Sequence, residues 1–153
     1  HITLKEATTS QEAVRKGIAN IPNGEEIAAM KLLAEKVFEP LRTYISMKRA
    51  KDTPIHINSF FRSKEVNEKI GGSTTSQHCK GEAIDIETNY CDFTNKDLFL
   101  TIRDKSTYDQ LIWEYGDDKE PAWVHVSYSK NGNRKQILKA VSENGRTKYI
   151  PFV

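Results

Sequence analysis

The chain has 153 residues, 37% of them hydrophobic, which is enough to build a buried core in one domain. Its 23 basic and 21 acidic residues are mixed along the chain and leave a net charge of +2, which excludes the concentrated basic surface of a nucleic-acid-binding protein. No apolar run approaches the roughly 20 residues of a membrane span. We therefore expect a single domain over residues 1–153 with neither a membrane span nor a nucleic-acid partner.

The sequence contains two cysteines, Cys79 and Cys91. Two are too few for a disulfide scaffold, and the sequence leaves open whether they pair. The chain begins at His1 rather than at a methionine and shows no signal peptide. Its redox compartment and its native amino terminus therefore stay open.

Capping patterns predict the first helices. The stretch "TSQE" from Thr9 is a Thr-x-x-Glu capping box, which predicts a helix over about residues 10–17. After the break at "IPNGEE", Asn23 and Glu26 predict a second capped start. A stripe of apolar residues at helical spacing then predicts the main core helix, with a kink at Pro40. The stripe consists of Ile27, Met30, Leu33, Ala34, Val37, Phe38, Leu41, Tyr44 and Ile45.

The remainder of the chain mixes strands with two short helices. Helices are predicted in "SKEVNEKIGG" (63–72), which ends at a glycine pair, and in "TNKDLFLTIRD" (94–104), which Thr94 caps. Strands are predicted in "TPIHINSFFRS" (53–63), "GEAIDIE" (81–87), "YDQLIWEYG" (108–116) and "AWVHVSYS" (122–129). The last two are expected to form a hairpin, and "RKQILKAV" (134–141) and "RTKYIPF" (146–152) are expected to be edge strands. The fold class is α+β with an antiparallel sheet.

Strand alternation brings out a possible metal site. In "AIDIE" the two isoleucines share one face and Asp85 takes the other, and in "VHV" the valines and His125 divide in the same way. If these strands are neighbours, Asp85 and His125 converge, and His78 in the preceding loop closes over the same point. Two histidines and an aspartate form a sound three-ligand set for zinc, with a fourth position open to water.

The same residues also allow a structural interpretation. A lone strand histidine is usually a hydrogen-bonded structural residue, and an aspartate between isoleucines commonly faces solvent. Cys79 beside His78 is expected to pack, because adjacent residues point apart in an extended chain. His56 has no partner in the sequence pattern and is expected to be structural. Spacing alone leaves the metal site and the structural interpretation equally open.

The stretch "SQHCKGEAID" resembles the Ser-x-His-x-x-Gly-x-Ala-x-Asp signature of the zinc D-alanyl-D-alanine peptidases. This group includes the vancomycin-resistance D,D-dipeptidases and the phage L-alanyl-D-glutamate endopeptidases, and it shares its fold with lysostaphin-type enzymes and the hedgehog signalling domain. "WVHVS" is similar to the second histidine motif of the family, "INSFFRS" to its arginine segment and "GGSTTSQH" to its Gly-Gly-Ser loop. The similarity runs from about residue 55 to 128. It implies an antiparallel sheet with helices on one side.

The resemblance also implies roles for individual residues. His78, Asp85 and His125 correspond to the ligands of one zinc ion. Arg62 would hold a carboxylate or carbonyl of the substrate, and Ser76 would form a hydrogen bond to the substrate or orient the site. For Arg62 and Ser76, a surface arginine and a loop-capping serine are the structural alternatives.

The catalytic acid of the family commonly lies three residues before the second histidine, and this position is Ala122 here. The base must therefore come from elsewhere, and Glu114 on the preceding strand is the first choice. Whether it faces His125 depends on the strand register. Three acidic residues in the following turn are the competitors: Asp117, Asp118 and Glu120.

The function implied by the resemblance is hydrolysis of peptide bonds in the stem or cross-bridge peptides of bacterial peptidoglycan. The enzyme would be a D,D-carboxypeptidase or an endopeptidase, in which the acidic base activates a zinc-bound water. The alternative is a non-catalytic, zinc-containing binding domain of the same fold. We expect a monomer that acts on the cell wall, either as a periplasmic or extracellular protein or as a phage product released from the cytoplasm.

Overall fold

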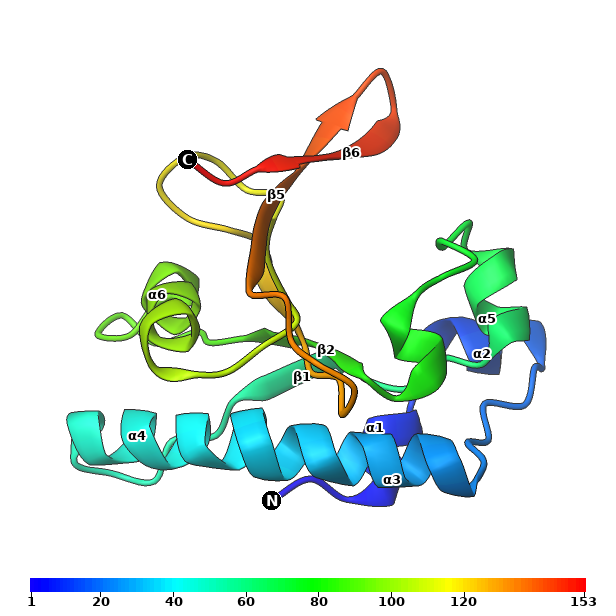
Figure 1. The fold of residues 1–153 in the computed structure, drawn as a ribbon, viewed down its shortest axis with the longest axis horizontal. Helices are drawn as coiled ribbons and strands as arrows, with labels where there is room; N and C mark the ends of the chain where they lie inside the picture. Colours follow the sequence, from blue (N-terminus) through cyan, green and yellow to red (C-terminus); the bar gives the residue numbers. More distant parts are fainter.

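The computed structural model describes residues 1–153, and its centre is a six-stranded sheet with helices packed against it (Figure 1). The predicted α+β class is therefore confirmed. The strands are β1 (His56–Ser59), β2 (Ala83–Glu87), β3 (Gln110–Glu114), β4 (Trp123–Ser127), β5 (Gln136–Glu143) and β6 (Arg146–Pro151). The α-helices are α1 (Leu4–Thr8), α2 (Gln11–Lys16), α3 (Gly24–Leu33), α4 (Glu39–Arg49), α5 (Lys64–Lys69) and α6 (Asn95–Lys105). Two further turns are the π-helical η1 (Ala34–Phe38) and the 3-10 helical η2 (Gln77–Lys80).

The strand order in the sheet is β1-β2-β4-β3-β5-β6. All neighbours are antiparallel except β3 and β5, which run parallel, so the expectation of a purely antiparallel sheet is wrong at this one pair. The expectation that both carboxy-terminal strands lie at an edge is also wrong for β5, because β6 covers it. The reason is that β4 ends where β3 begins, and the connection after β4 keeps the chain at this end of the sheet, next to Gln110. A strand that starts there beside β3 must run in the same direction.

The predicted core helix is present as α3, η1 and α4 in succession. Glu39 donates its backbone N–H to the carbonyl of Ala34, five residues back, so a π-helical turn lies just before Pro40. Proline lacks a backbone N–H, and a widened turn accommodates it in a continuing helix. The predicted stripe faces inward, and its fully or nearly fully buried members are Met30, Leu33, Val37, Phe38, Leu41 and Ile45.

Most of the predicted helix caps are confirmed. Asn23 and Glu26 form a reciprocal capping box at the start of α3, and Thr94 caps α6. The cap predicted at Thr9 is wrong, because Ser10 accepts the hydrogen bond from the third residue of α2 instead. The helix itself is where the pattern placed it.

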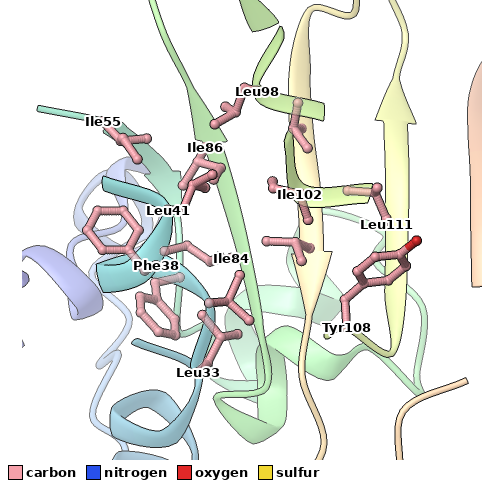
Figure 2. Packing of buried hydrophobic residues seen from close by; sticks show 14 of the residues in the cluster. Leu33, Phe38, Leu41, Ile55, Ile84, Ile86, Leu98, Ile102, Tyr108 and Leu111 are labelled. Atoms are coloured by element: carbon pink, nitrogen blue, oxygen red, sulfur yellow. The ribbon is translucent and has the colours of Figure 1, made fainter. Parts of the chain in front are cut away.

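One face of the sheet forms the hydrophobic core. Ile84 and Ile86 of β2 have no exposed surface, and they pack between the long helix and α6, whose Leu98 and Ile102 approach from the other side (Figure 2). The alternation predicted for β2 and β4 is therefore confirmed. None of the helices has the length and apolar character that crossing a membrane would require.

Candidate metal centre

His78, Asp85 and His125 converge on the face of the sheet opposite the core. Asp85 and His125 are direct Cα partners on β2 and β4, as the predicted parity requires. His125 Nδ1 lies 2.9 Å from Asp85 Oδ1, and His78 Nε2 lies 3.3 Å from Asp85 Oδ2. One possible ligand atom from each residue lies within 4.8 Å of the others. This spacing allows a single ion to contact all three side chains.

Local backbone conformation brings His78 to this point. His78 lies in η2, and Gly81 ends that turn with φ of +70°, a left-handed conformation that favours glycine. A Cβ atom at Gly81 would also lie 2.4 Å from the backbone oxygen of Glu26 in α3. The glycine therefore allows the chain to turn into β2 while pressed against a helix. On the other side, the backbone N–H of Arg62 donates to the carbonyl of His78.

The hydrogen bonds of His78 identify which ring nitrogen faces the site. His78 Nδ1 lies 2.7 Å from the carbonyl oxygen of Phe60, which can only accept, so Nδ1 carries a proton. In the neutral ring, Nε2 then presents a lone pair toward a carboxylate oxygen of Asp85. Two acceptors face each other favourably only when a cation lies between them or the ring is protonated. The arrangement thus fits a bound metal ion, and the Phe60 carbonyl orients the ligand.

Electrostatics keeps Asp85 ionised. Burial alone would raise its pKa, but His78 and His125 outweigh burial and hold the pKa of Asp85 well below its usual range. A carboxylate between two imidazoles is a donor set suited to zinc.

Glu114 lies on the same face as the triad. Its strand neighbour Ile112 is the Cα partner of His125, and Glu114 itself is opposite Trp123, which places it diagonally from His125. Only 6% of Glu114 is exposed, and its carboxyl group makes no hydrogen bond to the protein. Burial raises the pKa of Glu114 to about 7, with His125 opposing and Asp85 adding to the rise. The register that the sequence left open thus turns Glu114 toward the site.

The three competing acids have other partners. Asp117 accepts hydrogen bonds from two backbone N–H groups of its own turn, Asp118 pairs with Lys139, and Glu120 accepts from the backbone of Lys96. None of the three lines the cleft that contains the triad. Ala122, at the position where the family commonly carries its acid, is exposed, and its N–H donates to the carbonyl of Glu114. Apart from Asp85, the acidic residue that lines the cleft is therefore Glu114, on the neighbouring strand.

The triad and Glu114 line one cleft of about 600 Å³, which Arg62 and Ser76 also line. Arg62 donates to Asn67 Oδ1 at 3.2 Å and to Ser59 Oγ at 3.4 Å, so its guanidinium is held by neutral partners rather than by a carboxylate. The site residues predicted from the sequence thus lie together. The cysteines are apart and unpaired, with Cys79 buried and Cys91 exposed, and His56 is exposed outside the cleft.

Sequence reasoning missed further residues that line the cleft, among them Gln77 and Arg134, which both donate to Asp109 outside the cleft lining. Asp109 is buried and receives both side-chain hydrogen bonds of Arg134 and one from Gln77, the residue before His78. These contacts hold the pKa of Asp109 at about 2, mainly through Arg134. Tyr149 on β6 also lines the cleft. No spacing pattern connects these residues, because β5 and β6 reach the site only through the sheet pairing.

The sequence model of the peptidase M15 family matches residues 1–127. The matched part contains the triad, Glu114, Arg62 and Ser76, and it ends at the last residue of β4. A comparison with curated proteins found no match. Members of this family are zinc peptidases, in agreement with the His-Asp-His convergence. Because the match covers most of the chain, the protein belongs to the peptidase M15 family.

Proposed function

We propose that this protein is a zinc peptidase that hydrolyses peptide bonds in the stem or cross-bridge peptides of bacterial peptidoglycan. Its membership of the M15 family supports peptidase activity. The observation that carries the proposal is the presence of His78, Asp85, His125 and Glu114 in one cleft. Three ligands and a buried acid beside them form a set that suits metal-assisted hydrolysis.

His78, Asp85 and His125 would hold the ion, the first through Nε2, since its Nδ1 is engaged by Phe60. Zinc bound there supplies a Lewis acid, which makes a water molecule more acidic and polarises the scissile carbonyl group.

Glu114 acts as the general base. Its carboxylate accepts a proton from the attacking water and delivers it to the leaving amine nitrogen. In the metal-free chain burial raises the pKa of Glu114, and a carboxyl group with a raised pKa is a better proton acceptor than an ordinary glutamate. Burial causes this pKa, so the low exposure of Glu114 is part of its role.

Arg62 and Ser76 bind the substrate from the wall formed by residues 62–80. Arg62 has no acidic partner in the structure, which leaves its charge available for a substrate carbonyl or carboxylate. Ser76 lines the cleft two residues before His78, and its side chain does not cap η2. Its hydroxyl is therefore available to the substrate.

The test is digestion of purified peptidoglycan by the zinc-loaded protein, with the products identified by mass spectrometry. Glu114→Gln is expected to retain one zinc per chain while its activity falls by about 10²-fold or more. Gln110→Glu, which changes the charge of another cleft residue on β3, serves as a control for nonspecific effects on zinc content. Full zinc occupancy in the wild type without release of any peptide would overturn the proposal.

A non-catalytic, zinc-containing binding domain is the second candidate, and the observation that favours it is Ala122 at the usual acid position. The two candidates differ in one measurement. A binding domain would retain peptidoglycan fragments on a column without releasing any cleavage product, and Glu114→Gln would leave this retention unchanged.

A further inference from the structure

The register of the sheet divides the cleft into two ends. Asp85, His125, Ile112 and Leu138 are successive Cα partners across β2, β4, β3 and β5. We call this line of four residues the central row, and all four line the cleft. One end of the cleft lies toward Gln110, where β3 begins. The other lies toward Glu114, where β3 ends.

The cationic side chains that line the cleft lie at the end near Gln110 or level with the central row, and none of them starts from the end near Glu114. Lys80 lies in η2, just before β2 begins at this end, and Arg134 lies just before β5, beside Gln110. Arg62 follows β1 and its backbone lies beyond the central row in the same direction, but its guanidinium turns back and donates to Ser59 Oγ, which is level with Asp85. We call this the cationic end.

The opposite end is aromatic. Glu114 pairs with Trp123 on one side and Ala140 on the other, and Ala140 pairs with Tyr149. Trp123, Tyr149 and Tyr115 all line the cleft, and no lysine or arginine joins them at this end. The nearby lysines Lys139 and Lys148 alternate onto the other face of the hairpin, where they pair with acidic residues. We call Tyr115, Trp123 and Tyr149 the aromatic end.

The hairpin of β5 and β6 forms the wall of this end. The hairpin extends away from the rest of the sheet at the top of Figure 1, and α5 with the loop after it lies at the right of the same view. The Tyr149 phenol makes no hydrogen bond to the protein, whereas that of Tyr115 pairs with Thr147. Tyr149 is 54% exposed overall, and partial burial of its phenol together with the nearby Glu114 raises the pKa of Tyr149 to about 12. The phenol is therefore a neutral donor that faces the cleft.

The proposed chemistry assigns one side of the substrate to this end. Glu114 delivers a proton to the leaving amine, so the residue that carries this amine must lie beside Glu114. A free carboxylate on that residue would lie among Glu114 and aromatic rings, with no lysine or arginine at this end of the cleft to pair with it. An unpaired, partly desolvated carboxylate is unfavourable in such surroundings.

We infer that the protein cuts within a peptide chain rather than removing a terminal residue, because the aromatic end is a subsite for an uncharged leaving residue whose carbonyl accepts a hydrogen bond from Tyr149. This inference rests on the proposed function and adds the class of bond to it. The wall that makes this selection is the β5–β6 hairpin, which lies beyond the residues that the family model matches.

The first test uses the wild-type enzyme. Once digestion of peptidoglycan has located the scissile bond, two peptides that end one residue beyond it are synthesised. One ends in a free carboxylate and the other in a primary amide. We expect kcat/KM to be at least about tenfold higher for the amide, because it does not place a carboxylate beside Glu114. Equal values, or a preference for the free carboxylate, would overturn the inference.

The second test reverses the preference. Tyr149→Arg places a cation at the aromatic end and is expected to lower the amide-to-acid ratio of kcat/KM by about tenfold. The matched control is Glu143→Gln, which raises the net charge by the same amount on the same hairpin, at an exposed side chain outside the cleft. Its ratio should equal that of the wild type, and an equal fall in both variants would contradict a local effect.

Failure of the proposed function and failure of the inferred subsite give different experimental results. A zinc-loaded wild type that cleaves no wall peptide overturns the proposed function and the subsite with it. Release of single amino acids from free carboxyl termini confirms a peptidase but overturns the subsite. This second result does not depend on any variant folding.

Discussion

The two faces of the central sheet come from the same strands and differ in almost every physical respect. On β2, Ile84 and Ile86 have no exposed surface and belong to the hydrophobic core. Between them, Asp85 points the other way, where 13% of its side chain is exposed and two histidines surround its charge. Burial of apolar side chains on the core face stabilises the fold. The charges on the cleft face are favourable only when a group of opposite charge pairs with them. Adjacent residues of one strand therefore serve different purposes: the side chains that face the core stabilise the fold, and those that face the cleft form the candidate metal site.

The largest expected effect comes from removing a charge on the cleft face. Asp85→Asn should lower zinc content to less than about a tenth of an ion per chain and peptidase activity by about 10³-fold, because the central ligand loses its negative charge. Zinc content is measured by mass spectrometry of the metal.

Glu87→Gln is the matched control for this prediction. It lies on the same strand and face as Asp85, outside the cleft. The division of roles between the core face and the cleft face is contradicted if Asp85→Asn binds zinc normally, or if it unfolds as readily as a core variant does.

A smaller effect is expected from the core face. Ile84→Ala should lower the free energy of unfolding by about 3 kcal/mol, because it leaves a cavity at a fully buried site. Urea denaturation measures the loss. Zinc content should remain that of the wild type at temperatures where the variant is folded.

The control here is Ile21→Ala, at a residue that is 79% exposed, for which a change below about 0.5 kcal/mol is expected. Loss of zinc from folded Ile84→Ala would show that the two faces are coupled.

The smallest effect concerns pH and the metal-free protein. The pKa of Glu114 is raised from 4.5 to about 7 in the folded state, so the folded chain holds this proton more tightly than the unfolded chain does. The stability due to the protonated carboxyl group is fully present below pH 4.5 and is lost as the pH rises through about 7. Glu114→Gln removes this dependence.

We therefore expect the metal-free Glu114→Gln variant to gain stability relative to the wild type between pH 5 and pH 8, by an amount on the order of 2 kcal/mol. Thermal unfolding in a chelator at both pH values measures the gain. Gln110→Glu, at a less buried residue of the same strand, should show no comparable trend. A constant difference between wild type and Glu114→Gln at the two pH values would contradict the burial of an ionisable group.

Local patterns predicted most of the elements and the convergence of the triad. Alternation in "AIDIE" and "VHV" was sufficient to place Asp85 and His125 on one face, because side-chain direction in a strand follows from position alone. The face of Glu114 could not be predicted, since it depends on how β3 pairs with β4. The position of β5 and the contribution of Tyr149 depend on pairing between distant strands, for which the local sequence carries no signal. The cap at Ser10 was missed because two adjacent residues were equally good caps.

The pairing of Asp85 with His125 joins residues 40 positions apart, with α6 and β3 between them. During synthesis on the ribosome, the first two ligands emerge long before the third, and they cannot form the site until β4 has entered the sheet. Metal uptake should therefore follow folding rather than nucleate it. Zinc would slow unfolding by mass action and leave the rate of refolding unchanged.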